Sequence, residues 1–260
     1  MQSTSADRPT YSGAPHFGKP SGASGRKASR RVAGLDWDGI ESALDGYGNA
    51  VIPKLLTPAE CRELAALYPD DAIYRTRIVM SRHGFGSGEY KYFSYPLPGL
   101  VEDLRSAFYP CLASIANRWN QALRIATVFP PEHADFILRC REAGQNRPTP
   151  LMLQYGPGDY NCLHQDLYGE HVFPIQLAIL LSQPGLDFSG GEFVMTEQSS
   201  GRPARAEVVP LAQGDAVAFT VNTRPLPGKR GASRAAMRHG VSKVLSGRRH
   251  TLGIIFHDAR

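Results

Sequence analysis

The 260-residue sequence has few cysteines and no closely spaced cysteine pair. Cys61, Cys111, Cys140 and Cys162 are far apart along the chain. Structural zinc sites and thiol–disulfide motifs generally require cysteines separated by only a few residues. The spacing therefore excludes a zinc ribbon or a Cys-x-x-Cys redox centre. It predicts reduced thiols, as in a cytoplasmic protein.

The sequence also lacks long apolar runs. None approaches the roughly 20 residues that a membrane-spanning helix requires, and residues 1–31 contain no apolar core of a secretory signal. We therefore expect a cytoplasmic protein without a membrane partner. An organelle transit peptide has a similar composition to residues 1–31 and remains an alternative.

Net charge is missing from most of the chain. The formal charge of +5 comes entirely from residues 1–31, where six basic residues face only Asp7. This segment is rich in serine, glycine and proline and poor in large apolar residues, which predicts a disordered basic tail. An argument for nucleic-acid binding from bulk charge therefore depends on the tail alone.

The rest of the sequence contains enough apolar residues for one large domain, since the hydrophobic fraction is 42%. Residues 32–148 are expected to form a helical support with a lid region. Apolar spacing and capping signals predict helices over 35–44, 57–67, 99–108, 112–123 and 132–143, with a short strand at 50–52. We read 84–88, which is rich in glycine, as a flexible loop.

Residues 149–260 change to short β-rich runs separated by glycine and proline turns. Seven strands are predicted, over 150–155, 174–182, 191–196, 205–210, 215–222, 237–245 and 249–257. About seven strands in such a span suit a two-sheet jelly roll. The predicted class is therefore α+β, with a double-stranded β-helix (jelly roll) core buttressed by N-terminal helices.

His164 and Asp166 form a His-x-Asp pair within this β-rich half. On an extended strand, residues two apart point to the same face. A second histidine would complete the two-histidine, one-carboxylate set of non-haem Fe(II) oxygenases. His239, several strands later, is favoured as this ligand. The other histidines lie in the tail, before the β region, near Asp166 or beside Arg249, and His257 on the last strand stays a minor candidate.

A basic residue follows the second histidine at a suitable distance. Arg249 opens an alternating strand pattern and is preferred to Arg248, which stays the alternative. A guanidinium offers two parallel hydrogen bonds to a carboxylate. Arg249 is thus the predicted partner for the far carboxylate of a 2-oxoacid co-substrate. The turn Ser246-Gly247 is expected to join two strands that bring Arg249 and His239 to one cavity.

Taken together, the H-x-D…H…R pattern resembles the Fe(II)/2-oxoglutarate-dependent dioxygenases. Within that superfamily, Gln154-Tyr155-Gly-Pro-Gly followed by Leu163-His164-Gln165-Asp166 is similar to AlkB-type nucleic-acid demethylases. The longer pattern, which includes 82–92, 191–197 and 214–218, looks closer to a bacterial family of oxygenases acting on damaged DNA. This resemblance spans about residues 34–258.

The resemblance implies His164, Asp166 and His239 as metal ligands and catalytic residues. It implies Arg249 as the partner of 2-oxoglutarate and Tyr155 as a hydrogen-bond donor to it. The expected cofactors are Fe(II), 2-oxoglutarate and O2, with ascorbate as an optional accessory. Leu153 departs from the AlkB pattern, which usually has asparagine there, so the surroundings of the co-substrate must differ.

Two basic segments point toward a substrate. The first combines cationic and aromatic side chains suited to stacking and phosphate contact, with Arg77, Tyr90 and Tyr92 as substrate candidates and Arg75, Lys91 and Phe93 nearby. Packing of a lid against the core is the alternative. The second, 224–238, is expected to border the mouth of the active site, with a solvated loop as its alternative.

The leading functional prediction is oxidative demethylation or hydroxylation of methylated or alkylated nucleic acid, as in DNA repair. A protein or small-molecule hydroxylase with the same metal chemistry is the first alternative. A cupin-like metal-binding module without 2-oxoglutarate is the second. That module would have no use for Arg249.

Overall fold

The computed structural model describes residues 22–167, 169–228 and 231–260. Its helices are α1 (Gly22–Ala33), α2 (Trp37–Tyr47), α3 (Pro58–Ala66), α4 (Gly99–Ala122) and α5 (His133–Glu142). Two short 3₁₀ turns lie at Asp71–Ile73 and Met80–Arg82. Within these ranges, no helix is long and apolar enough to cross a membrane.

The strands are β1 (Asn49–Ile52), β2 (Tyr74–Val79), β3 (Gly86–Ser87), β4 (Glu89–Phe93), β5 (Leu151–Tyr155), β6 (Tyr160–His164), β7 (Ile175–Leu180), β8 (Phe188–Gly190), β9 (Phe193–Ser199), β10 (Arg205–Val209), β11 (Ala216–Thr220), β12 (Thr223–Leu226), β13 (Ser233–Val241), β14 (Val244–Gly247) and β15 (Arg249–Ile254). The larger sheet has the order β1-β11-β7-β15-β5-β4-β2. The second has the order β10-β9-β13-β6-β3, with β12 also beside β13, and β14 pairs with β8.

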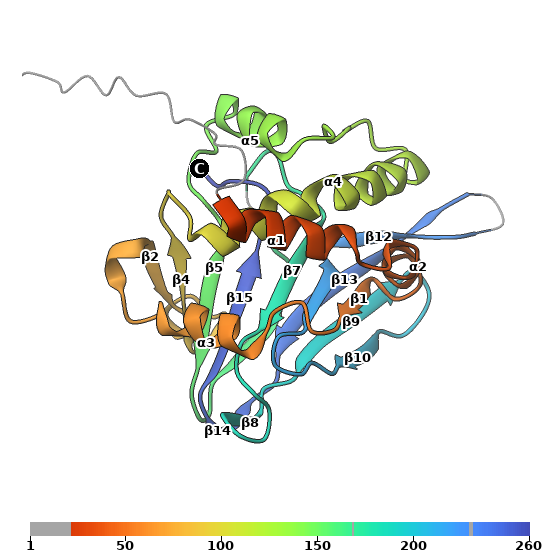
Figure 1. Ribbon diagram of the computed structural model, residues 1–260. Helices are drawn as coiled ribbons and strands as arrows, with labels where there is room; N and C mark the ends of the chain where they lie inside the picture. Colours follow the sequence, from red (N-terminus) through yellow and green to blue (C-terminus); the bar gives the residue numbers. More distant parts are fainter. Residues whose placement is uncertain (1–21, 168, 229–230) are drawn as a thin grey trace, which may run out of the picture.

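The seven-stranded sheet lies between the helices and the second sheet. In Figure 1, α1, α3 and α4 lie across one face of it. Leu177, Ile179 and Leu252 point to this face and share one apolar core with the helices. Val217 and Phe219 point to the opposite face, where they pack with Phe193 and other residues of the second sheet. The alternation of side chains along each strand thus gives the sheet two buried faces.

Local signals in the sequence give the correct start of α3. The Thr57 hydroxyl accepts the backbone N–H of Glu60, and the Glu60 carboxylate accepts the backbone N–H of Thr57. Such a capping box satisfies backbone N–H groups that would otherwise lack partners. The predicted helix over 57–67 agrees with the structure, and the four cysteines are not paired with one another.

Three predictions of local structure were wrong. The helices expected over 99–108 and 112–123 are one helix, α4, which contains Pro110. Phe108 and Leu112 on either side of the proline are completely buried, so packing outweighs the lost hydrogen bond. Helix α1 covers 22–33, so ordered structure begins before the predicted end of the tail at 31, while residues 1–21 lie outside the described residues. The supposed loop at 84–88 contains β3, which pairs with β6.

The support region is also less helical than predicted. Strands β2 and β4, both before residue 149, extend the larger sheet beyond β5. The run expected as one strand over 237–245 is divided, because β13 ends at Val241 and β14 begins at Val244. Consequently His239 and Arg249 come from different sheets, rather than from two strands joined directly by the 246–247 turn.

Candidate metal centre

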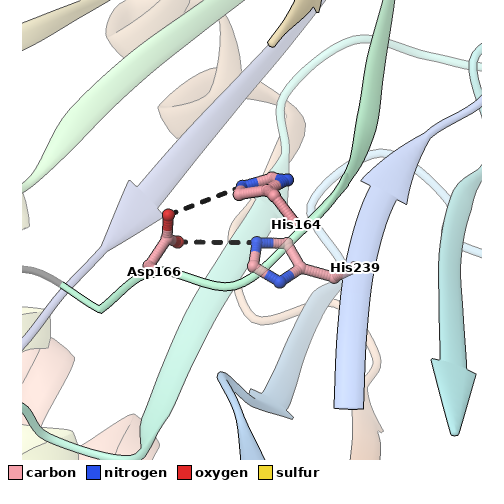
Figure 2. A group of neighbouring side chains, drawn as sticks. All are labelled: His164, Asp166 and His239. Atoms are coloured by element: carbon pink, nitrogen blue, oxygen red, sulfur yellow. Dashed lines mark ion pairs between the residues drawn. The ribbon is translucent and has the colours of Figure 1, made fainter. Parts of the chain in front are cut away.

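Three predicted ligands lie together between the sheets. His164 is the last residue of β6, and its register partner across the ladder is His239 on β13. Asp166 follows two residues after the end of β6, and its carboxylate faces both imidazoles (Figure 2). Its two carboxylate oxygens lie 3.5 Å from the Nε2 atoms of His164 and His239. One potential ligand atom from each residue lies within 4.8 Å of the others.

Hydrogen bonding orients the first imidazole for this role. The Nδ1 of His164 lies 2.8 Å from the carbonyl oxygen of Cys162. A carbonyl only accepts, so Nδ1 carries the proton and Nε2 presents a lone pair to the centre. Such a partner commonly fixes the tautomer of a metal-binding histidine. Two imidazoles and one carboxylate with free positions opposite them are suited to Fe(II).

Electrostatics keep the carboxylate ionised. Burial by itself would raise the pKa of Asp166, but hydrogen bonds and charge from His164 and His239 hold that pKa well below its usual range. Burial lowers the pKa of His239, despite the opposing influence of Asp166. The pKa of His164 is raised, because the hydrogen bond and charge of Asp166 outweigh its burial. Asp166 is therefore anionic and His239 favours the neutral form, which are protonation states that bind a metal.

Arg249 lies on the opposite wall of the same cavity. It begins β15, faces Tyr155 of β5 in register, and is only 2% exposed, whereas Arg248 is exposed to solvent. Its Nη1 donates to Thr251 Oγ1 at 2.5 Å. Gly191 has a φ of +66°, and a Cβ there would come within 2.9 Å of Arg249 Cδ. Glycine at that position makes room for the arginine stem.

No carboxylate in the described part of the chain forms an ion pair with Arg249. Burial lowers the pKa of its guanidinium. A buried cation without an anion is costly unless a ligand supplies one. The Nε of Arg249 and the hydroxyl of Tyr155 are also buried without a hydrogen-bond partner. These groups fit the distal carboxylate of a 2-oxoacid.

The triad and Arg249 line a single cavity of about 190 Å³. Sequence reasoning missed Gln176 on β7, which lines this cavity and is 4% exposed, with its amide nitrogen unpartnered. It pairs in register with Phe219, whose ring centroid lies 4.6 Å from that of His239. Gln176 therefore lies toward the metal end. The alternation of side chains along β7 indicates which face of the sheet Gln176 points to. It does not indicate which residues of other strands surround it.

The predicted substrate residues separate into two groups. Tyr90 and Tyr92 of β4 line the cavity. Arg77 does not line it, because it pairs in register with Lys91 on the other face of the sheet and forms an ion pair with Glu89. The structure thus places the two tyrosines at the cavity and Arg77 away from it.

Arg224 also differs from the expectation for 224–238. It is 2% exposed, binds Glu197 at 2.5 Å and donates to the carbonyls of Asp45 and Gly46. It therefore joins β12 to the end of α2, rather than bordering the mouth of the site. The minor ligand candidate His257 is similarly engaged elsewhere, since its Nδ1 accepts the backbone N–H of Phe173.

Comparison with known proteins agrees with this architecture. The chain is 45% identical over 167 residues to an uncharacterized protein, Rv2227, of Mycobacterium tuberculosis, a match that spans 64% of this chain and 72% of that protein. It superposes on a Pseudomonas putida prolyl-4-hydroxylase with a TM-score of 0.51 and 15% identity, covering 86% of this chain and 99% of that one.

Two further solved structures have the same fold. A Trichoplax adhaerens prolyl hydroxylase in complex with a hypoxia inducible factor peptide fragment gives a TM-score of 0.52 at 12% identity, over 88% of this chain and 90% of that one. The epimerase SnoN from nogalamycin biosynthesis, described as non-heme and alpha ketoglutarate dependent, gives 0.51 at 14% identity, over 84% and 81%. At such low identity the likeness concerns the fold alone.

A family model gives the more specific match. It is described as an oxygenase catalysing oxidative methylation of damaged DNA, and it matches residues 88–259. That range covers well over half of the chain and contains the triad, Tyr155 and Arg249. The resemblance read from the sequence is confirmed, and the chain belongs to this oxygenase family.

Proposed function

We propose that this protein is an Fe(II)- and 2-oxoglutarate-dependent dioxygenase that removes methyl or alkyl groups from nucleic acid by oxidation. The observation that carries the proposal is that one cavity contains both the His164, Asp166 and His239 cluster and the unneutralised guanidinium of Arg249. We further propose that the two facing sheets form a jelly roll, with residues 149–260 as its core and 32–148 as its support.

His164, Asp166 and His239 would hold the iron on one side. With O2 and 2-oxoglutarate, bound iron would supply the oxidising power for attack on a substrate C–H bond. Arg249 would form two parallel hydrogen bonds to the distal carboxylate of the co-substrate. The Tyr155 hydroxyl, also buried without a partner, would donate to it. Fixed polar groups in a buried cavity orient the co-substrate and exclude bulk water.

The family description supports a nucleic-acid substrate, and the tyrosines at the cavity fit such a ligand. Tyr90 and Tyr92 contact each other edge to face, with ring centroids 5.4 Å apart. Aromatic side chains provide stacking surfaces for bases. A methylated base would have to be single-stranded or flipped out of a duplex to reach the triad between the sheets.

The unpaired Arg249 distinguishes this proposal from a metal-binding module without a co-substrate. Such a module would gain nothing from a buried guanidinium, which costs free energy when no anion is present. A protein or small-molecule hydroxylase would use the same triad and arginine. Such a hydroxylase would differ only in the substrate that enters the cavity past Tyr90 and Tyr92. A comparison of substrate classes therefore decides between the two functions.

The metal chemistry can be tested without a substrate. Anaerobic addition of Fe(II) and 2-oxoglutarate is expected to give a weak visible charge-transfer band. His164→Ala should lose the band because it removes a ligand, whereas His83→Ala, at an exposed histidine outside the triad, should retain it. A wild-type protein with neither the band nor succinate production in air would refute the oxygenase proposal.

Succinate release then tests the substrate class. We expect stimulation by single-stranded oligonucleotides that carry N-methylated bases. Matched unmethylated oligonucleotides, peptides and free amino acids serve as comparisons. Stimulation by peptides or amino acids alone would support the proposed oxygenase chemistry. It would show that the substrate is not nucleic acid.

A further inference from the structure

Arg75 lies over a tyrosine that lines the cavity. The central carbon of its guanidinium is 4.4 Å from the centroid of the Tyr92 ring, and Tyr92 lines the cavity. Its Nε donates to the carbonyl oxygen of Pro148 at 2.8 Å. One nitrogen is thus used to fix the side chain, and the guanidinium is held over an aromatic ring.

A β-bulge gives Arg75 this direction. In the β2–β4 ladder, Tyr74 is opposite Phe93 and Thr76 is opposite Tyr92, so Arg75 is an extra residue without a register partner. A bulge re-aims a side chain and interrupts the alternation of faces. Arg77, two residues later, follows the regular register and points to the other face, where it binds Glu89.

A second arginine, Arg147, directly precedes Pro148, whose carbonyl oxygen binds Arg75, and its charge influences Arg75. Arg147 is exposed, and its backbone is fixed by two hydrogen bonds with Ala259, of 2.9 and 2.8 Å. Gln145, two residues earlier, accepts the backbone N–H groups of Glu170 and His171. Glu170 and His171 belong to the segment that follows Asp166. The two arginines therefore lie where the cavity wall at Tyr92 meets the chain leaving the metal centre.

The described part of the chain supplies no ion-pair partner to either arginine. Glu170 pairs with Arg260 at 3.5 Å, and Asp258 is buried against Arg105. Burial lowers the pKa of Arg75, and the positive charge of Arg147 lowers it further, against the opposing influence of Tyr92 and Asp258. Because Asp258 already forms an ion pair with Arg105, the two neighbouring cations keep a local excess of positive charge that an anion would relieve.

We propose that Arg75 and Arg147 form a phosphate-contact site for the backbone of a nucleic-acid strand whose target base enters the cavity past Tyr92. Guanidinium groups match the geometry of phosphate oxygens, and an adjacent aromatic ring provides a surface for a base. The inference rests on the nucleic-acid substrate proposed above. It assigns the cationic role to Arg75 and Arg147 in place of Arg77.

The test is binding of a fluorescein-labelled single-stranded oligonucleotide with one N-methylated base, followed by anisotropy from 50 to 200 mM KCl. We compare Arg75→Gln, Arg147→Gln and the double variant with Arg77→Gln, a matched control on the same strand. Each of the first two should weaken binding about tenfold. Each should reduce the slope of log K against log salt by about 0.7, the value for one phosphate on a single strand.

The outcomes separate the two proposals. Reduced affinity and slope in Arg75→Gln and Arg147→Gln, with Arg77→Gln within twofold of wild type, support the site. Oligonucleotide binding that is equally strong and equally salt-dependent in all variants overturns the site but leaves the proposed function. A wild-type protein that does not bind the oligonucleotide overturns both. Arg147 is exposed, so its variant remains informative if Arg75→Gln folds poorly.

Discussion

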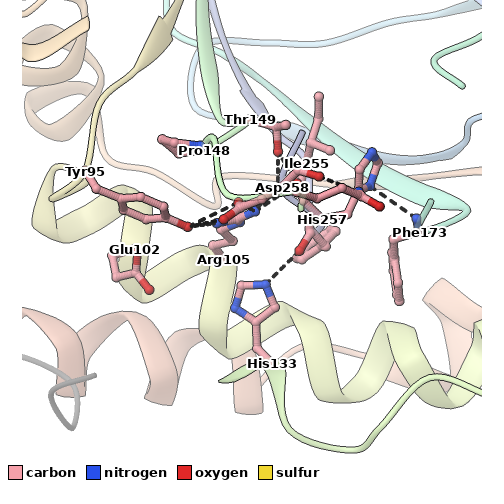
Figure 3. A network of polar contacts seen from close by, with 12 residues as sticks. Tyr95, Glu102, Arg105, His133, Pro148, Thr149, Phe173, Ile255, His257 and Asp258 are labelled. Carbon is pink, nitrogen blue, oxygen red and sulfur yellow. Dashed lines mark hydrogen bonds and ion pairs between the residues drawn. The ribbon is translucent and has the colours of Figure 1, made fainter. Parts of the chain in front are cut away.

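The buried charges around Arg105 and those around Arg249 are satisfied to very different degrees. Arg105 of α4 binds Asp258 at 2.8 Å and also donates to the carbonyls of Ile255 and His257 and to the hydroxyl of Tyr95 (Figure 3). Both charged side chains of the pair are at most 1% exposed. The network ties α4 to the chain that follows β15, and its charges are neutralised within the protein.

In the cavity around Arg249, by contrast, several buried polar groups have no partner. Its unpartnered buried atoms include Arg249 Nε, Tyr155 Oη and Gln176 Nε2. Folding normally pairs buried polar groups, because an unpaired one costs about 1–3 kcal/mol. Arg105 is thus neutralised within the fold, whereas burial of Arg249 costs free energy unless a ligand supplies an anion. This difference supports the proposed role of Arg249 in binding 2-oxoglutarate.

Disrupting the satisfied network should have the larger effect on stability. Arg105→Met leaves Asp258 buried without its cation, and we expect a loss of about 3–5 kcal/mol in the free energy of unfolding. Urea denaturation of the metal-free protein measures it. Arg105→Met combined with Asp258→Leu should recover part of the loss, since no charge then remains unpaired. A loss below 1 kcal/mol in the single variant would contradict the comparison.

Replacing the unsatisfied arginine should affect ligand binding instead. Arg249→Met should weaken 2-oxoglutarate binding by about 2–3 kcal/mol, because two charge-assisted hydrogen bonds disappear. Iron affinity and the stability of the ligand-free protein should not fall. Titration of the charge-transfer band and urea denaturation supply both values. Unchanged affinity for 2-oxoglutarate would transfer the role to Arg248, and Arg248→Met is the matched control.

A smaller effect concerns His133, which packs beside the Arg105 network. Burial, with help from the charge of Arg105, lowers the pKa of His133 to about 3, and its Nε2 lies 2.8 Å from the carbonyl oxygen of Phe256. The unfolded chain takes up this proton near pH 6.5, while the folded chain does not until far lower pH. Protons therefore favour unfolding, and stability falls as the pH drops below 6.5.

His133 should contribute about 2 kcal/mol to the loss of stability between pH 8 and pH 5. His257, whose pKa burial lowers to about 4, adds an effect of the same sign. Urea denaturation at pH 8, 6.5 and 5 measures the profile. His133→Gln should flatten it without removing it, and an identical profile in that variant would show that His133 is not the cause.

Patterns that act over a few residues were predicted best. The capping box at Thr57 and Glu60 and the seven predicted strands of the second half depend on neighbours in sequence, and their geometry follows from helix and strand periodicity. The described residues of that half contain four further strands, β6, β8, β12 and β14, which the sequence did not reveal as separate strands. The proximity of His164 and Asp166 was predicted, but Asp166 lies beyond the end of β6, so strand alternation does not account for it. The parity argument for Arg249 over Arg248 belongs with the capping box and the predicted strands, because alternation along one strand makes one residue buried and the other exposed.

Features that depend on distant partners were missed. Pro110 remains inside α4 because the surrounding helix surface is buried by the sheet and its neighbours. Arg224 looked like part of a basic loop, but its partners Glu197 and Asp45 are remote in sequence. Arg75 and Arg77 are two residues apart, so regular strand alternation would point both to the same face. Only the pairing of β2 with β4 reveals the bulge that turns them to different faces.

The sequence by itself indicated the proposed chemistry, because the identities of two imidazoles, one carboxylate and a later guanidinium limit which ion and which co-substrate would bind. Only the tertiary structure decided the surroundings of Gln176, Arg75 and Arg224. Those side chains take their direction from strand register and bulges, which are set by packing between segments far apart in the chain. The proposed function therefore depends on residue identity in the His164, Asp166 and His239 cluster and on strand register around it.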